Sequence, residues 1–214
     1  MIFHGFVQAG GASRRFGEDK ALVKLGGTSM LQRTGELLAR ICDDVVVVAP
    51  TARYADSRWP VLTDCWPGEG PLGGILTALK SIDSTSFTDS ADASEDVARR
   101  FAVILGCDMP FLTAEFLQFL IDRTARSRAQ VIVPESSGRL EPLCACWHAT
   151  AVEPVQDAFD SGVRKVSEAM KHLPMEVLDE SAWKRFDSDN RLFWNMNTPE
   201  DYETARRILE NGNR

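Results

Sequence analysis

A loop that combines glycines with cations follows the first apolar segment of the chain. From residue 8 to residue 20 it reads Gln-Ala-Gly-Gly-Ala-Ser-Arg-Arg-Phe-Gly-Glu-Asp-Lys. Glycines let a backbone approach a ligand closely and leave N–H groups free to donate to it. Three cations in one loop, Arg14, Arg15 and Lys20, indicate a polyphosphate ligand. The alternative is a flexible glycine turn that carries solvated arginines.

The order of residues in this loop disfavours two common nucleotide-binding motifs. Lys20 is followed by Ala21, so the loop does not match the P-loop pattern G-x-x-x-x-G-K-[ST]. It also lacks the G-x-G-x-x-G pattern of dinucleotide-binding proteins. A P-loop NTPase and a nicotinamide-dependent dehydrogenase are therefore disfavoured.

Two carboxylates stand at the ends of apolar segments. Asp108 follows the apolar segment 101–107 and precedes Met109-Pro110, a placement that suits a hard cation such as Mg²⁺. Asp64 follows the segment 60–63 and is placed to contact a base, a ribose or the water shell of a metal. For both residues the alternative is an ordinary aspartate that caps a turn.

Two asparagines flank Met196 shortly before the last predicted helix. Alternation puts the side chains of Asn195 and Asn197 on one face, where they would supply neutral ligands to a metal or to a phosphate-bearing substrate. The alternative is that they stabilise the loop by side-chain to backbone hydrogen bonds. Cys144 and Cys146 also share a face, and we expect two small buried hydrophobic residues there rather than a metal site.

The segments that must position these residues predict an α/β fold. Segment 2–8, helix 29–41 and the valine-rich segment 44–49 form a strand-helix-strand unit, which implies a parallel sheet. Ligands bind beyond the carboxyl ends of the strands in such sheets. The glycine loop, Asp64 and Asp108 all fall at strand ends, and this convergence predicts one site. Further strands are expected at 60–64, 101–107 and 130–134, and a helix at 72–80.

The remaining segments have weaker or less regular patterns. Residues 81–100 are rich in serine and aspartate, and we expect a mobile surface insertion there. The last third predicts a strand over 140–147, helices near 150–160 and 163–171, and a short strand at 176–178. A final helix should begin with Thr198 as its cap and Pro199 in its first turn, and should end near Leu209.

Composition excludes several classes of protein. The chain has 214 residues, 44% of them hydrophobic, which is enough for one large domain. Its net charge of -7 gives it no bulk attraction to nucleic acid or to an anionic membrane. We see no signal peptide and no apolar run long enough to span a membrane, and expect a cytoplasmic protein. The five cysteines are odd in number and scattered, which argues against a disulfide framework.

Five segments, in order, resemble one family. Residues 8–22 are similar to the L-A-G-G-x-S-x-R-M-G-x-D-K-A-L signature of the molybdenum cofactor guanylyltransferases, the MobA type. Residues 70–75 resemble that family's G-P-L-x-G-I segment, and residues 106–110 its C-D-M-P metal motif. Residues 141–143 and 195–201 resemble its x-P-L strand and its N-x-N-T-P-E-D element. The first loop alone is moderately specific, and five segments in the right order make a strong match.

The resemblance implies a single Rossmann-like, three-layer α/β/α nucleotidyltransferase domain with a mostly parallel central sheet, over residues 1–214. Residues 1–112 would mainly bind the nucleotide and residues 113–214 mainly the acceptor. The reaction implied is transfer of GMP from GTP to the molybdenum-molybdopterin cofactor, with Mg²⁺ as cofactor and pyrophosphate as product. The substrates would be the partners, with transient contacts to proteins that deliver or accept the cofactor.

The family's functional residues carry over onto matching positions. Catalytic roles fall on Arg15, Lys20 and Asp108, and Mg²⁺ would be held by Asp108, with Asn197 as a further candidate. The nucleotide would be contacted by Gln8, Ala9, Gly10, Gly11, Ser13, Lys20, Asp64, Gly70, Pro71 and Asp108. A weaker match of residues 162–165 to the family's G-x-R-x loop, together with the asparagine motif, places on the acceptor side Arg164, Lys165, Asn195 and Asn197.

Departures from the family pattern bear on the choice of base. Gln8 stands where the family usually has Leu, Phe16 stands where it has Met, and residues 48–50 lack the Asn that some members use for the nucleotide. Related cytidylyltransferases usually carry L-A-A-G and lack G-P-L-x-G, which favours GTP. The alternatives are a related transferase that uses CTP, a sugar-phosphate or another phosphate acceptor, and a non-catalytic nucleotide sensor on the same fold.

Overall fold

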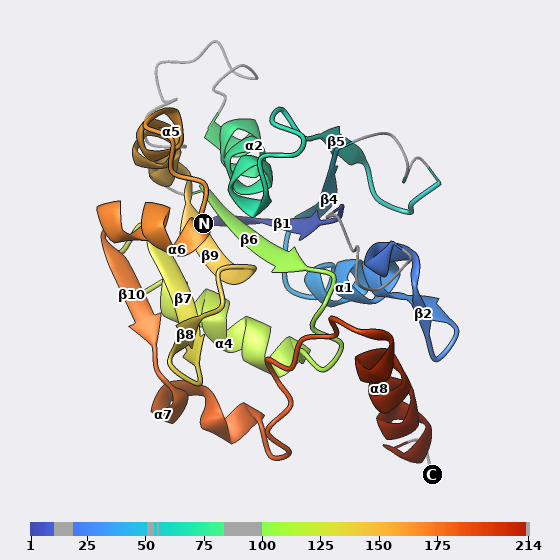
Figure 1. Ribbon diagram of the computed structural model, residues 1–214. Coiled ribbons are helices and arrows are strands. Elements are labelled where there is room, and N and C mark those ends of the chain that lie inside the picture. Colours follow the sequence, from blue (N-terminus) through green and yellow to red (C-terminus); the bar gives the residue numbers. More distant parts are fainter. Residues whose placement is uncertain (11–18, 51–53, 55, 84–99, 213–214) are drawn as a thin grey trace.

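A computed structural model describes residues 1–10, 19–50, 54, 56–83 and 100–212 (Figure 1). Within them, one central sheet contains the strands β1 (Ile2–Gln8), β4 (Asp44–Ala49), β5 (Val61–Thr63), β6 (Arg100–Gly106), β7 (Val131–Ser136), β8 (Arg139–Leu140), β9 (Cys144–His148) and β10 (Met175–Leu178). Their order is β10-β7-β9-β6-β1-β4-β5, and β8 pairs with β7. β9 is antiparallel to both of its neighbours, whereas the other pairs along this order are parallel. The predicted mostly parallel sheet is confirmed.

Helices cover both faces of the sheet. One hydrophobic core contains residues of α1 (Met30–Leu38), α4 (Ala114–Thr124), α7 (Glu180–Trp183) and α8 (Pro199–Gly212). The other contains residues of α2 (Pro71–Asp83), α5 (Val152–Asp160) and α6 (Val166–Ala169). Figure 1 shows α2 and α5 on one side of the sheet and α1 and α4 on the other. The three-layer α/β/α architecture is therefore confirmed.

Alternation along the strands divides side chains between these two cores. In β4, Val45 and Val47 belong to the core beside α1, whereas Val46 and Val48 pack into the core beside α2. A continuous valine run is what a strand buried on both faces requires. In β1, Phe3 and Val7 likewise belong to the core beside α1 and Phe6 to the core beside α2, which places β1 at the centre of the molecule.

Side-chain hydrogen bonds cap several helices, among them the predicted cap of α8. The Ser29 hydroxyl accepts from the backbone N–H of Gln32 (3.2 Å), and Thr113 accepts from that of Phe116 (3.2 Å). Thr198 accepts from the N–H of Asp201 (3.1 Å) at the start of α8. Each bond satisfies a donor that the first helical turn leaves free. Two ends differ from the prediction, since α1 stops at Leu38 and α8 continues to Gly212.

The single strand predicted over 140–147 is wrong. β8 ends at Leu140 and β9 begins at Cys144, and a turn occupies 141–143 between them. Pro142 has no N–H for a ladder, and the N–H of Cys144 donates to the carbonyl of Glu141 (2.9 Å) to close the turn.

The bounds of the predicted insertion at 81–100 also change. Residues 81–83 complete α2 and Arg100 begins β6, while 84–99 lie outside the described residues. A short hairpin of β2 (Lys24–Leu25) and β3 (Thr28–Ser29) was not predicted. Gly26 and Gly27 form its turn with positive φ, as two-residue hairpins favour. Short 3₁₀ helices complete the described elements: η1 (Lys20–Leu22), η3 (Ala149–Ala151), η4 (Met170–His172) and η5 (Lys184–Phe186). No helix in the described part of the chain is long and apolar enough to cross a membrane.

Candidate active site

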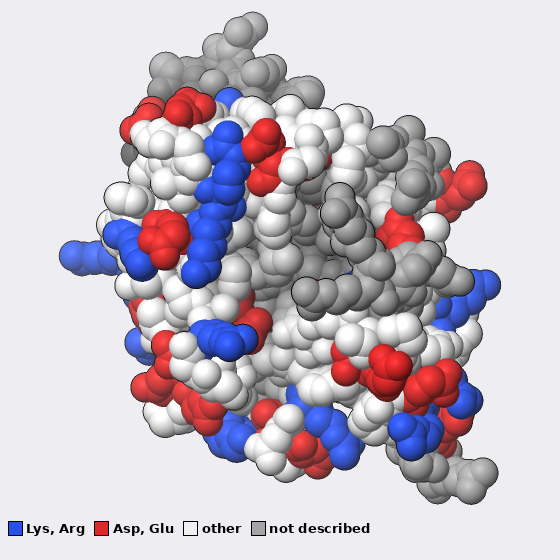
Figure 2. All heavy atoms as spheres, in the orientation of Figure 1, with Lys and Arg blue, Asp and Glu red and all other residues white. Residues whose placement is uncertain are grey.

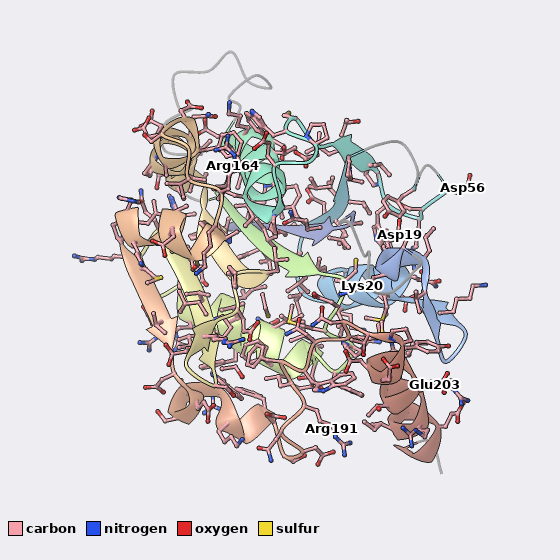
Figure 3. All side chains as sticks on the ribbon, viewed as in Figure 1. Asp19, Lys20, Asp56, Arg164, Arg191 and Glu203 are labelled. Atoms are coloured by element: carbon pink, nitrogen blue, oxygen red, sulfur yellow. The ribbon has the colours of Figure 1, made fainter. Side chains whose placement is uncertain are left out.

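Four neighbouring parallel strands, β1, β4, β5 and β6, end at one edge of the sheet, which we call the carboxyl edge. Gln8 is the last residue of β1 and lies opposite Gly106 of β6. Asp64 follows β5 and Asp108 follows β6. Figure 3 places Lys20 near the middle of the molecule, beside the hollow that Figure 2 shows. The edge thus gathers several of the residues singled out from the sequence.

Gln8 joins the end of β1 to the start of α2. Its Nε2 donates to the carbonyl of Pro71 (2.9 Å), and its Oε1 is buried with no partner among the described residues. Gly74 makes room for this side chain, because a Cβ there would lie 2.4 Å from Nε2. The next residue, Ala9, is buried and donates its N–H to Val48 (2.9 Å). The structure therefore gives Gln8 a fixed position at the mouth of the glycine loop.

Gly10 starts the glycine loop in a conformation that suits glycine alone. Its φ is +98°, and a Cβ would lie 2.4 Å from Cδ of Pro50. A side chain at this position would meet both backbone strain and a steric clash. The other predicted loop residues lie outside the described residues: Gly11, Ser13, Arg14 and Arg15.

Lys20 returns from the loop toward the carboxyl edge. Asp19 caps η1 by accepting from the N–H of Ala21 (3.1 Å), which fixes the backbone beside Lys20. The Lys20 Nζ donates to Oδ1 of Asn197 (2.7 Å). The carboxylate of Asp201 in turn accepts from the N–H of Asn197 (2.8 Å). Residues 177 positions apart are thus joined directly, and the first and last motifs meet.

Asp64 shapes the loop that leads into α2. Its Oδ1 accepts from the N–H of Trp66 (2.9 Å) and from the hydroxyl of Thr77 (3.1 Å). Gly70 has a φ of +80°, and Pro71 then begins the helix. One carboxylate oxygen of Asp64 therefore holds the loop. This is a structural role, which the sequence had left open as the alternative to a contact with the nucleotide or the metal.

Asp108 carries the most unusual polar atom at the carboxyl edge. Its Oδ1 is buried and has no hydrogen-bond partner among the described residues. Gly106 leaves space for it, since a Cβ there would lie 2.9 Å from this oxygen. Burial raises the pKa of Asp108, and the charge of Lys20 opposes that rise. The carbonyl of Asp108 accepts from the N–H of Met196 (2.7 Å), which brings the asparagine motif beside it.

Glu141 is a second carboxylate that sequence reasoning did not place in the site. Burial raises its pKa to about 7, and the charge of Asp108 adds to the rise. A hydrogen bond from Asn195 and the charge of Arg139 act in the opposite direction. The sequence did show Glu141 within the E-P-L motif, but its role depends on the unpredicted turn between β8 and β9.

Arg164 and Lys165 lie elsewhere. The Arg164 guanidinium pairs with the carboxylate of Glu69, donates to the carbonyl of Phe159 (2.7 Å) and stacks on the Phe159 ring. Lys165 is exposed at the start of α6. In Figure 3, Arg164 lies beside α2 and α5, apart from Lys20. The structure thus joins Lys20 and Asn197 and separates them from Arg164.

The expected burial of Cys144 and Cys146 is confirmed. Both are fully buried, and burial raises the pKa of both thiols, that of Cys146 to about 12. The described residues contain no group of three or more His, Cys, Asp or Glu side chains arranged to hold a metal. These thiols therefore act as small core residues.

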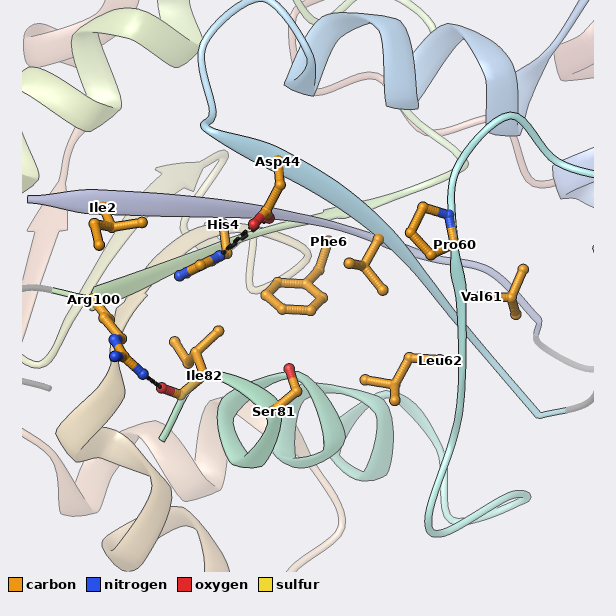
Figure 4. A pocket seen from close by; sticks show the side chains of 11 residues that line it. Ile2, His4, Phe6, Asp44, Pro60, Val61, Leu62, Ser81, Ile82 and Arg100 are labelled. Carbon is orange, nitrogen blue, oxygen red and sulfur yellow. Dashed lines mark hydrogen bonds and ion pairs between the residues drawn. The ribbon is translucent and has the colours of Figure 1, made fainter. Parts of the chain in front are cut away.

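A separate cleft of about 540 Å³ lies at the opposite edge of the sheet (Figure 4). His4 pairs with Asp44 on its wall (2.9 Å), and Arg100 donates to the carbonyl of Ile82 (3.2 Å). Its remaining lining is largely apolar and includes Phe6. Since His4, Asp44 and Arg100 lie near the amino ends of their strands, this cleft is distinct from the carboxyl edge.

Comparison with known proteins decides the family. A family model described as the MobA-like NTP transferase domain matches residues 5–174, most of the chain. The chain belongs to this family. As a MobA-like transferase it is a nucleotidyltransferase, and the resemblance inferred from its motifs is confirmed.

Individual relatives agree with this assignment. A molybdenum cofactor guanylyltransferase of Desulfosudis oleivorans is 30% identical over 97% of this chain and 96% of its own. The crystal structure of molybdopterin-guanine dinucleotide biosynthesis protein A from Archaeoglobus fulgidus superposes with a TM-score of 0.79 at 24% identity, covering 97% of this chain and 99% of that one. A cytidylyltransferase for 2-C-methyl-D-erythritol 4-phosphate from Thermus thermophilus gives 0.65 at 14% identity, over 96% and 98% of the two chains. These two solved structures show that the MobA-like transferase shares its fold with other nucleotidyltransferases.

Proposed function

We propose that this MobA-like transferase moves GMP from GTP to the terminal phosphate of the molybdenum-molybdopterin cofactor, in the cytoplasm. The products are molybdopterin guanine dinucleotide and pyrophosphate. The observation that carries the proposal is the buried Oδ1 of Asp108, which has no hydrogen-bond partner among the described residues and lies near Lys20 and the asparagine motif at the carboxyl edge. The names of the relatives support the choice of substrates.

The residues around Asp108 fit a magnesium ion. Mg²⁺ prefers oxygen ligands. The Oδ1 of Asp108 has no hydrogen-bond partner in the described part of the chain and lies in a space that a side chain at position 106 would fill. Asn197 is a further candidate, although its Oδ1 accepts from Lys20 in this structure. Magnesium held there would stabilise the negative charge of the triphosphate and of the departing pyrophosphate.

The chain's own residues bind and orient the substrates. Lys20 supplies a positive charge at the carboxyl edge, and we assign Arg15 the same role. The nucleotide contacts that we propose are made by Gln8, Ala9, Gly10, Gly11, Ser13, Lys20, Asp64, Gly70, Pro71 and Asp108. The acceptor contacts that we propose are made by Arg164, Lys165, Asn195 and Asn197. Residues 1–112 and 113–214 are then the nucleotide and acceptor halves of a single domain.

The reaction needs no base from the protein. The attacking group is a phosphate monoester, whose second pKa is near 6, so it is mostly dianionic at neutral pH. Its oxygen bonds to the α-phosphorus of GTP, and the bond to the β-phosphate breaks as pyrophosphate leaves. Catalysis is then positioning and charge stabilisation, the work for which cations at the edge are suited.

Two substitutions test these roles. Asp108→Ala should abolish formation of the dinucleotide while its thermal unfolding stays close to that of the wild type. Lys20→Ala should lower kcat/KM by roughly 10²–10³-fold, because it removes a cation that stabilises transition-state charge. Lys171→Ala is the control, since that lysine is exposed and pairs with Glu168 on a distant helix. Full magnesium-dependent activity in the Asp108 variant would overturn the assignment.

A further inference from the structure

The turn between β8 and β9 brings Glu141 near Asp108. β6 and β9 pair in an antiparallel register that ends with Leu105 opposite Cys144. The N–H of Gly106 donates to the carbonyl of Leu143 (2.9 Å), which extends the pairing by one residue. This pairing leaves Leu143, two residues from Glu141, beside Gly106, two residues from Asp108, before both segments enter turns. The electrostatic effect of Asp108 on Glu141 agrees with this closeness.

The carboxylate of Asp108 turns toward this neighbouring strand. A Cβ on Gly106 would lie 2.9 Å from Oδ1 of Asp108 and 3.3 Å from Cβ of Leu143. The oxygen therefore sits above Gly106, on the side where β9 begins. It is the same oxygen that is buried with no hydrogen-bond partner among the described residues.

Asn195 holds Glu141 in this position. Its side chain hydrogen-bonds to the Glu141 carboxylate, and its Nδ2 also donates to the carbonyl of Phe193 (3.0 Å). The backbone beside it is fixed to the Asp108 carbonyl through Met196 (2.7 Å). Three separate segments of the chain thus converge on a pair of carboxylates.

A pair of half-buried carboxylates repels the phosphates of a nucleotide unless a cation lies between them. Like charges that share a site disfavour each other's ionised form. Among the described residues, the charge of Lys20 acts on Asp108 and that of Arg139 on Glu141, and the Nζ of Lys20 donates to Asn197. The Oδ1 of Asp108, without a hydrogen-bond partner among the described residues, and the nearby Glu141 carboxylate together offer the hard oxygen ligands that divalent cations prefer.

We propose that Glu141 is the second carboxylate of the divalent-cation site on Asp108, and that Asn195 positions it. The inference rests on the proposed function, in which Asp108 holds the metal. It adds a ligand from the proposed acceptor half of the chain, so residues from both halves would hold the metal. Asn195 then acts through Glu141, as a positioning residue.

Binding of Mn²⁺ to the full chain tests the inference without turnover. Mn²⁺ is titrated with and without a non-hydrolysable GTP analogue, and free Mn²⁺ is measured by electron paramagnetic resonance. Glu141→Gln, which keeps the shape of the side chain, should weaken binding by about tenfold or more. Asn195→Ala should weaken it less, and Asp108→Asn should abolish it. Glu153→Gln, on an exposed residue of α5, is the matched control and should bind as the wild type does.

The outcomes separate this inference from the proposed function. If Asp108→Asn loses Mn²⁺ while Glu141→Gln binds it with wild-type affinity, Glu141 is not a ligand and the proposed function stands. If Asp108→Asn binds Mn²⁺ normally, or if the wild type binds none even with the analogue, Asp108 does not hold the metal. The metal site is then wrong in the proposed function and in this inference alike. Thermal unfolding of each variant shows whether the chain is folded.

Discussion

Replacing Gly106 with alanine should damage the site more than the fold. The new Cβ would lie 2.9 Å from Oδ1 of Asp108 and 3.3 Å from Cβ of Leu143. Since ordinary contacts begin at about 3.5 Å, the carboxylate must move by roughly 0.5 Å. A displacement of 1 Å in a catalytic group costs about 100-fold, so we expect kcat/KM to fall roughly tenfold. Metal affinity should fall with it, because the displaced oxygen is the proposed ligand.

A matched control separates this effect from crowding in the sheet. In the neighbouring strand, a Cβ on Gly5 would lie 3.0 Å from Cβ of Leu38 and 3.2 Å from the carbonyl of Asp44, far from the carboxyl edge. Both alanine variants should lose about 1–3 kcal/mol of stability, or about 2–12 °C in Tm. Steady-state kinetics at a temperature where both are folded should show loss of kcat/KM only in Gly106→Ala. Equal kinetics in the two variants would refute the reasoning.

Three further predictions follow from the geometry. In urea unfolding, Gly10→Ala should lower the free energy of unfolding by about 2–4 kcal/mol, because the new side chain meets both a positive φ and the proline after β4. Gly26→Ala is the control, since Gly26 has a positive φ but open space around it, and it should lose about 1 kcal/mol. Equal losses in the two variants would contradict the clash. Titration of Glu141 should make the stability of the chain depend on pH. In EDTA, the free energy of unfolding should fall by about 1–2 kcal/mol as the pH rises from 4.5 to 7, a magnitude that allows for the partial exposure of Glu141. Stability falls with rising pH because burial, and then the charge of Asp108, raise the pKa of Glu141 to about 7, so the folded chain binds that proton more tightly than the unfolded chain does. If Glu141→Gln leaves the dependence of stability on pH unchanged, this prediction is contradicted. Arg164→Ala should raise KM for the pterin acceptor several-fold and leave KM for GTP unchanged, and a change confined to GTP would reverse the assignment of that side.

Local patterns in the sequence predicted much of the fold. The valine run of β4 and the Thr198 cap depend on residues a few positions apart, so the sequence displays them directly. Ends of elements were less accurate, because tertiary packing sets them. The split of the predicted strand at 141–143 arises from a proline and a turn closed within the sheet.

The site was predicted in part, for the same reason. Asp108 and Lys20 carry recognisable motifs, and the structure brings both to the carboxyl edge. Glu141 was missed as a site residue, because its place near Asp108 depends on strand pairing and on a turn that bring together segments 33 positions apart. The contacts of Gln8 with Pro71 are equally non-local.

Identification of the nucleotide and the product tests the central claim most directly. The full chain is incubated with Mg²⁺, the molybdenum-molybdopterin cofactor and each of the four NTPs in turn, and pyrophosphate and the dinucleotide are measured. We predict equal amounts of pyrophosphate and molybdopterin guanine dinucleotide with GTP, and neither product with Asp108→Ala. Product from CTP in place of GTP, or pyrophosphate that does not require Asp108, would contradict the account.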